Sequence, residues 1–205
     1  MRLAGVLSMK RLLLVLAMFA AGHLAAQDGS LKMYLRGGVN YNTGQLGLDS
    51  GLTQGSLIVE GEIPNNGFHF GLSVREFHDN GSYLSFDAGY HETSYDVILV
   101  DPSGQQVTQR LQSQAIQVGV SPGIRVFKFI RGQAGINATF EMNDTFEETF
   151  NTYKLGYRIG SGLDFGNYSI DVMYLGSFRS TSGEWNGLTL NNATSEYLVG
   201  LAIKI

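Results

Sequence analysis

Residues 195–205 read SEYLVGLAIKI, and an apolar side chain falls at every second position from Tyr197 to Ile205. The positions between them hold Leu198, Gly200, Ala202 and Lys204. A period of two predicts a β-strand with two different faces. Terminal residues fray unless neighbouring structure holds them. We therefore expect this stretch to pair on both edges, as the closing strand of a barrel does.

The same alternation recurs along the chain and predicts eight strands. We expect them at residues 31–42, 68–77, 83–91, 112–121, 129–142, 152–165, 168–179 and 195–205. Residues 56–63, SLIVEGEI, also alternate, but a ninth strand would give an odd number. We interpret them as a hairpin extension or an ordered stretch inside the first long loop.

The predicted connections alternate between short and long. Asp79–Gly81 and Gly166-Asn167 are typical of tight turns because Gly and Asn tolerate positive φ. Residues 121–128 predict a slightly longer turn. The links at 43–66, 99–106, 143–151 and 180–194 are longer still. Short turns at one end and long loops at the other are typical of outer-membrane barrels.

The distribution of glycine and aromatic residues indicates which face of each strand points outward. Glycines such as Gly38, Gly119 and Gly162 share the polar face, where a narrow lumen crossed by long cationic side chains needs small neighbours. Aromatic residues gather on the apolar face near the strand ends, as in the girdles of membrane barrels. The sequence therefore predicts an all-β fold, an eight-stranded antiparallel up-and-down transmembrane β-barrel.

The first 26 residues have the pattern of a secretory signal peptide. Lys10 and Arg11 precede an apolar stretch at 12–21, and small residues lead up to Gln27. The apolar stretch is shorter than the ~20 residues of a membrane-spanning helix. We expect a signal peptide at 1–26, with Met9 a plausible start, and a barrel domain at 27–205. That domain has 11 basic and 18 acidic residues, a net charge of −7, and no cysteine.

Several stretches resemble one family of bacterial proteins. GFHFGLSVREF (67–77), YLSFDAGYHETSY (83–95), AIQVGVSPGIRVFKFIRGQAGINATF (115–140) and YSIDVMYLGSF (168–178) are similar to the small outer-membrane β-barrel proteins of the Bacteroidota type, the porin-family or PorT-like proteins. The resemblance implies the outer membrane of a Gram-negative bacterium and contact with outer-membrane lipid. It also implies that the barrel-insertion machinery reads the closing strand. Many such barrels end in Phe, whereas this sequence has Ile205.

We expect the inward-facing charges to form a network inside the lumen, because an unpaired charge in a low-dielectric interior is costly. Counting residues through the predicted turns places Arg75 near Asp87, Glu141 near Lys154 and Arg179 near Glu196. It also places Asp164 and Asp171 within reach of Lys204 and Lys32. The full predicted network comprises Lys32, Arg36, Arg75, Asp87, Arg131, Glu141, Lys154, Arg158, Asp164, Asp171, Arg179, Glu196 and Lys204.

Catalytic and metal-binding motifs are weak, so we expect neither an enzyme nor a cofactor. The turn at Asp79–Gly81 places His69 opposite His91. These two side chains could bind a metal ion only with a third ligand, and the neighbouring Glu92 falls on the opposite face of the strand. Ser94 and Asp96 lie near His91, but Ser94 faces the other way. GSGLDFGN (160–167) does not match a nucleotide-binding loop. The acidic charge disfavours nucleic-acid binding.

The long loops are acidic and leave three hypotheses for function. Acidic residues without a neighbouring base occur at Asp49, Glu60, Glu62, Asp144, Glu147 and Glu148, and Glu184 stands beside the single tryptophan, Trp185. Such a rim is a solvated surface, or it binds a protein partner or divalent cations that bridge anionic lipid. The first hypothesis is a structural or interaction role in the cell envelope, with a lumen too full to be a general pore. The alternatives are an accessory factor for secretion or surface assembly, and an outer-membrane enzyme acting at the mouth.

Overall fold

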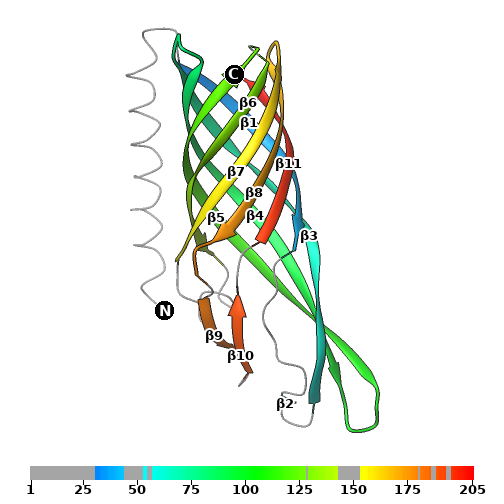
Figure 1. The fold of residues 1–205 in the computed structure, drawn as a ribbon. Coiled ribbons are helices and arrows are strands. Elements are labelled where there is room, and N and C mark those ends of the chain that lie inside the picture. The colour runs from blue at the N-terminus through cyan, green and yellow to red at the C-terminus, as the bar shows by residue number, and fades with distance from the viewer. Residues whose placement is uncertain are drawn as a thin grey trace, which may run out of the picture.

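The computed structural model describes residues 31–43, 53–54, 57–127, 129–142, 153–179, 181–185, 188–192 and 195–205. In this part of the chain, eight antiparallel strands form a closed ring (Figure 1). Their bounds are β1 Leu31–Asn42, β3 Leu57–Phe77, β4 Ser82–Val100, β5 Gln106–Val126, β6 Ile130–Glu141, β7 Tyr153–Phe165, β8 Tyr168–Ser177 and β11 Ser195–Lys204. The predicted fold class, an up-and-down barrel, is confirmed.

The stretch SEYLVGLAIKI closes the ring. β11 pairs with β8 on one edge and with β1 on the other, and β1 pairs in turn with β3. The amide of Ile205 donates to the carbonyl oxygen of Met33 at 3.0 Å, so even the last residue of this stretch is held. Both edges of the closing strand are paired, as the alternation predicted.

Three short strands lie outside the ring. β2 (Thr53–Gln54) pairs with the start of β3, while β9 (Thr181–Trp185) and β10 (Leu188–Asn192) form a separate hairpin. Figure 1 shows that hairpin, together with β2, at the end of the barrel opposite the tight turns.

Residues 57–66 continue β3 and pair with β4, so they extend that hairpin, as the first of the two interpretations of 56–63 expected, and are not a ninth strand. The partner β4 and the next strand β5 are also much longer than predicted and are joined by a short turn at 101–105. The register of β3 against β4 shifts between Val59 and Gly61 and again between Asn65 and Phe68. Each bulge adds one residue and moves the alternation to the other face. This interruption explains why 56–63 look like a separate strand in the sequence.

Both predicted tight turns have a glycine at positive φ. Gly81 has φ of 82° and Gly166 has φ of 64°, which L-residues rarely adopt. The expected turn at 121–128 is wrong, because β5 continues to Val126. Backbone pairing between β5 and β6 is interrupted at Ser121 and Pro122, because proline has no N–H to donate to the neighbouring strand. The chain instead turns at Phe127, a non-glycine residue with φ of 53°.

The two faces of the barrel differ as predicted. Apolar residues of the outward set, among them Leu35, Leu155 and Leu201, expose 52–59% of their surface. Arg131 and Arg158, on the inward set, expose only 1%. The strands therefore present an apolar exterior and bury charge, the reverse of a soluble barrel.

Some predictions fall outside the described residues: the signal peptide at 1–26, Asp49, the acidic residues of 143–151, and the side chains of Glu62, Glu184 and Trp185. In the described part of the chain, no helix has the length and apolar character needed to cross a membrane.

Candidate functional site

Four charged side chains near the turn end of the lumen form one ion-pair cluster, which we call the base cluster: Arg75, Arg131, Asp164 and Asp171. Arg131 donates through Nε to both oxygens of Asp164, at 2.8 and 2.9 Å, and through Nη2 to Asp171 at 2.6 Å. Arg75 donates to Asp171 at 2.8 Å and lies 3.9 Å from Asp164. Two guanidinium groups thus face two carboxylates, and the cluster is electrically balanced.

The other cations at the turn end do not join this cluster. Lys32 and Lys204 were expected to pair with Asp164 and Asp171, and this prediction is wrong. Lys32 lies over the ring of Phe77, with Nζ 4.9 Å from the centroid, and Lys204 is exposed. Two arginines reach the aspartates instead. Arg75 extends from β3 across the lumen to Asp171 on β8, and Arg131 extends from β6 to Asp164 on the neighbouring strand β7 and to Asp171.

Aromatic side chains line the same end of the lumen. Tyr34, Phe77 and Tyr83 are all buried there. The guanidinium carbon of Arg75 lies 4.3 Å from the ring centroid of Tyr34, and that of Arg125 lies 4.5 Å from Phe77. These cation–π contacts add to the ion pairs and fill the space beneath them.

A second group of charges, the central cluster, comprises Arg36, Asp87 and Arg158. Asp87 accepts from Arg36 at 2.9 Å and lies 2.7 Å from Nη2 of Arg158. The predicted pair of Arg75 with Asp87 is wrong, because Arg75 turns toward β8. With two cations and one anion, the central cluster carries an excess of one positive charge.

Glycines make the space that these arginines occupy. A Cβ added at Gly119 would lie 3.2 Å from both Cδ and Cζ of Arg158, and one added at Gly162 would lie 2.9 Å from Cζ of Arg131. Both arginines are almost fully buried, so their side chains have little freedom to move away. The inference that inward glycines accommodate large cations agrees with this geometry.

The third group lies at the loop end of the ring, on β4, β6, β7 and β11, and we call it the mouth cluster: His91, Glu141, Lys154 and Glu196. Lys154 Nζ donates to Glu141 at 2.9 Å, and Ser113 Oγ donates to the second oxygen of Glu141 at 2.8 Å. The structure thus brings the predicted pair of Glu141 and Lys154 together.

The predicted pair of Arg179 with Glu196 is wrong. Arg179 lies beyond the end of β8 and is exposed. Glu196 is buried and turns inward, with Oε2 3.4 Å from Nδ1 of His91. Arg179 follows the last residue of its strand, where alternation no longer fixes the direction of a side chain.

The two histidines occupy the predicted register. His69 pairs with His91 across β3 and β4, and their rings stack with centroids 5.6 Å apart. Asn40 joins them: its Oδ1 lies 2.6 Å from Nδ1 of His69, and its Nδ2 lies 3.3 Å from Nδ1 of His91. The described residues contain no group of three or more His, Cys, Asp or Glu side chains that could hold a metal ion.

The residues weighed for catalysis do not converge. Ser94 lies on the outward parity of β4 and His91 on the inward parity. Asp96, also outward, accepts two hydrogen bonds from Arg110, at 2.8 and 3.2 Å. No hydrogen bond joins Ser94 to His91, so these three residues lack the geometry of a nucleophile and base.

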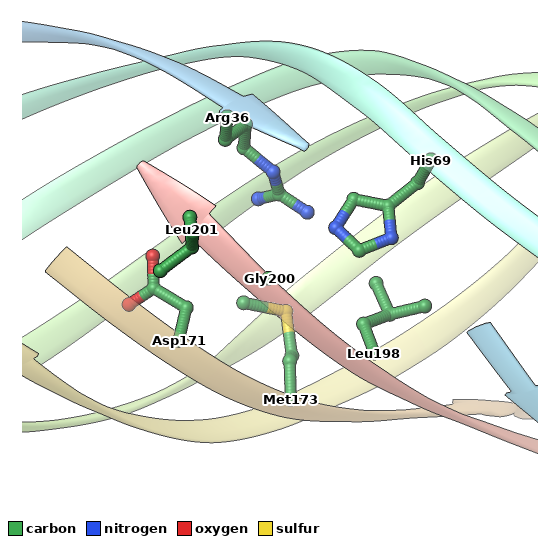
Figure 2. A pocket seen from close by; sticks show the side chains of 7 residues that line it. All are labelled: Arg36, His69, Asp171, Met173, Leu198, Gly200 and Leu201. Atoms are coloured by element: carbon green, nitrogen blue, oxygen red, sulfur yellow. The ribbon is translucent and has the colours of Figure 1, made fainter. Parts of the chain in front are cut away.

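Two small cavities lie among the described lumen side chains. One cavity of about 10 Å³ is lined by Arg36 and His69 on one side and by Asp171 and Met173 on the other (Figure 2). A second cavity, of about 20 Å³, lies in the mouth cluster. A cavity needs roughly 10–15 Å³ for one water molecule, so each has room for one or two.

Sequence reasoning missed several lumen residues. Asn40 and Ser113 lie on the inward parity, so alternation alone could have placed them beside charged neighbours. Met173, Leu175 and Leu198 form an apolar cluster inside the barrel. Arg158 Nε lies 3.1 Å from the sulfur of Met173. Apolar residues on a polar face give no sequence signal of this packing.

Three strands continue past the mouth as a sheet, which we call the extension: residues 57–66, 93–100 and 106–113 (Figure 1). Eight residues of β4 lie beyond Glu92, a length of roughly 25 Å at ~3.3 Å per residue. Tyr95, Val97 and Leu99 on one face are almost fully buried. On the other face, hydrogen bonds from Arg110 lower the pKa of Asp96 below its usual range.

Comparison with known proteins gives a likeness of fold. No family model matches the chain, and no curated protein matches it. Similar solved structures include the outer membrane protein OprG from Pseudomonas aeruginosa, with TM-score 0.47, 12% identity, and coverage of 85% of this chain and 95% of that one.

Two further structures have comparable similarity. Yersinia pestis Ail in a phospholipid bilayer nanodisc has TM-score 0.41 and 14% identity, with coverage of 85% and 99%. The outer membrane protein AlkL in DMPC bilayers has TM-score 0.47 and 11% identity, with coverage of 85% and 90%. None of the three is similar enough to transfer a role to this chain.

Proposed function

We propose that this protein is an outer-membrane β-barrel with a non-enzymatic interaction role, performed by the extension rather than by the lumen. The observation that carries the proposal is the inverted polarity of the barrel. Its apolar residues face outward and its arginines are buried in ion pairs. A closed ring of strands also pairs backbone groups internally and leaves no open sheet edge, as a lipid environment requires.

The length of the strands supports a membrane location. β6, β7, β8 and β11 have 12, 13, 10 and 10 residues, close to the ~9–11 that a tilted strand needs to cross a bilayer. The signal-peptide pattern of residues 1–26 supports export. The expected results are heat-modifiable gel mobility and solubility that depends on detergent. Recovery of a soluble periplasmic monomer without detergent would contradict a membrane location.

The lumen supports no general pore. Eight-stranded barrels have an interior that side chains just fill, and Arg131 and Arg158 cross this one in ion pairs. The two cavities hold at most a few water molecules. Purified protein in planar bilayers should therefore show no stable open conductance.

The extension supports binding of a partner with a basic surface. By sequence its three strands and the turn at 101–105 contain four acidic residues, Glu60, Glu62, Asp96 and Asp101, and one basic residue, Arg110. Charge complementarity mainly accelerates and orients association, so binding should weaken with salt. An accessory role in secretion or surface assembly, which the family resemblance implies, is the alternative. It would use the same surface.

The experiment is capture of partners from native envelope by cross-linking. A variant with β4 and β5 joined by a tight turn near Ser94 and Gln112 removes most of the extension and leaves the ring intact. This variant should lose capture while keeping heat-modifiable mobility. A matched control with Gln109→Ala, at an exposed position of β5 within the extension, keeps the extension. Equal capture by both proteins would contradict a role for the extension. Loss of several surface proteins on gene deletion would favour the secretion alternative.

A further inference from the structure

Three cations at the turn end of the lumen lie outside the ion pairs, and we call them the turn-end rim: Lys32, Arg125 and Lys204. In the described part of the chain, none of the three makes an ion pair or a side-chain hydrogen bond. Deeper in the lumen, five inward cations each lie 2.6–2.9 Å from a carboxylate oxygen: Arg36, Arg75, Arg131, Lys154 and Arg158. The rim therefore differs from the rest of the lumen in having no anionic partner among the described residues.

The strand register explains why these charges are left over. Lys32 pairs with Arg75 across β1 and β3, and Arg125 pairs with Arg131 across β5 and β6. Like charges directly opposite each other are unfavourable in a sheet. In each pair one arginine turns to the aspartates of the base cluster, and these carboxylates already face two guanidinium groups. The second cation of each pair stays at the rim.

The three cations also lie close together. Lys32 Nζ is 4.9 Å from the ring centroid of Phe77, and the guanidinium carbon of Arg125 is 4.5 Å from the same centroid. Their charges are thus less than about 10 Å apart, the screening length at ~0.1 M salt. Lys204 pairs with Tyr34, two residues from Lys32 on the same face of β1, and is therefore a diagonal neighbour of Lys32. Like charges at this range repel one another, so an anion between them is stabilising.

Positive charge is concentrated at this end of the barrel. Five described inward cations, the three of the rim and the two arginines of the base cluster, face the two aspartates of that cluster, an excess of three positive charges among these side chains. The nearby Glu76 has outward parity, and Asp79 is exposed in the turn without an ion pair to the rim. The barrel domain as a whole carries −7. The excess at the rim is therefore local.

The rim can be reached from solution. Lys204 is exposed, and Lys32 and Arg125 are half-buried, whereas Phe77 beside them is buried. Cation–π contacts with Phe77 hold the two half-buried cations in place and leave their N–H groups free to donate. In outer-membrane barrels the short turns face the periplasm.

We propose that the turn-end rim binds a phosphate group on the periplasmic side of the membrane. The planar guanidinium of Arg125 fits two phosphate oxygens, and the ammonium groups of Lys32 and Lys204 add two point charges. The phosphate belongs to a soluble ion or to a lipid headgroup of the periplasmic leaflet. Both sources have the same chemistry at the site, and experiment distinguishes them.

The test is NMR of the mature protein in micelles of a sugar-headgroup detergent, which contains no phosphate. Inorganic pyrophosphate is added in one series, and phosphatidylglycerol is mixed into the micelles in the other. The amide signals of Lys32, Arg125 and Lys204 should shift saturably in at least one series. A response to pyrophosphate assigns the site to soluble phosphates. A response to phosphatidylglycerol alone assigns it to the lipid headgroup.

Variants identify the groups that bind. Arg125→Gln removes the planar donor and should weaken binding at least about tenfold, because a hydrogen bond between charged groups is lost. Arg125→Lys keeps the charge without the planar fork and should restore only part of the affinity. Arg179→Gln is the matched control, because Arg179 is an exposed cation at the loop end, and it should bind as the native protein does.

The absence of a saturable shift in both series would overturn the proposal, and the native protein alone decides this even if a variant fails to insert. Equal affinities of Arg125→Gln and the native protein would also overturn it. Heat-modifiable gel mobility checks that each variant has folded. The extension lies at the other end of the barrel, so these titrations are independent of partner capture and of the function proposed above.

Discussion

Replacing Asp171 with alanine should destabilise the barrel more than any change of a surface charge. Asp171 contacts both arginines of the base cluster, at 2.8 Å for Arg75 and 2.6 Å for Arg131. After its removal Arg131 keeps its two hydrogen bonds to Asp164. Arg75 keeps no close carboxylate, only a 3.9 Å contact with Asp164, a 3.3 Å contact with Ser169 Oγ and its cation–π contact with Tyr34. The variant therefore leaves one buried guanidinium nearly unpaired.

The magnitude follows from the cost of breaking a buried ion pair. Removing one partner typically costs ~3–5 kcal/mol. The side chain of Asp171 is 18% exposed, so partial solvation places the expected loss near the lower end, about 3 kcal/mol. Arg75→Met in the Asp171→Ala background removes the orphaned charge and should recover part of the loss.

Equilibrium unfolding by urea in lipid vesicles, followed by far-UV circular dichroism, measures these differences. Asp96→Ala is the matched control, because Asp96 pairs with Arg110, whose side chain is 67% exposed. Exposed pairs contribute ~0–1 kcal/mol. Equal and small losses in Asp171→Ala and Asp96→Ala would refute the reasoning, since the base cluster would then be solvated and the inward face wrongly assigned.

Three further predictions concern the seam, the lumen and the extension. Gly38→Ala should destabilise the barrel by at least ~2 kcal/mol in the same unfolding assay, because the added Cβ would clash with the β11 backbone at Val199 and Gly200. The control Gly132→Ala should have little effect, because the space around Gly132 is open. Arg158→Ala should leave the conductance of planar bilayers near zero, because Arg36, Met173 and the base cluster still occupy the lumen; a native protein with stable open current would contradict the filled interior. Arg110→Ala should raise the pKa of Asp96 toward its usual value, as NMR titration of the Asp96 side chain can measure. Because the folded-state pKa is depressed, this pair stabilises the native protein above the unfolded-state pKa of Asp96. The stabilisation is lost as pH falls through the folded-state value, and it is small because both groups lie at the surface.

The sequence predicted the ring but not the extension, and the reason lies in the two bulges of β3. Alternation identifies a strand only while the register is unbroken. The shift between Asn65 and Phe68 separates 57–66 from the rest of β3, so those residues look like part of a loop. At Ser121 and Pro122 the sequence predicted a turn where the strand continues. A proline followed by a glycine indicates a turn, but here only the backbone pairing with β6 is interrupted.

In the candidate site, the sequence predicted which side chains face inward but not which of them pair. Parity places Arg75, Asp87 and Asp171 on the inward face, and each lies there in the structure. The choice of partner across the lumen depends on depth, strand tilt and side-chain reach, none of which alternation records. Glu141 and Lys154 could be paired because they belong to adjacent strands. Arg75 and Asp171 lie on β3 and β8, which are not neighbours.

The central claim is that the apolar face of this barrel contacts lipid, and adjacent residues of the closing strand test it most directly. The natural sequence has no cysteine, so a single nitroxide label can be placed at Leu201, which is 59% exposed and outward, or at Ala202, which is fully buried and inward. In lipid bilayers, the collision rate of the label with molecular oxygen, which concentrates in lipid, is compared with its collision rate with a water-soluble nickel chelate. The label at position 201 should be far more accessible to oxygen than to the chelate, and the label at 202 should be shielded from oxygen. A label at 201 that is as accessible to the chelate as one on the exposed turn at Gly104 would contradict the membrane barrel.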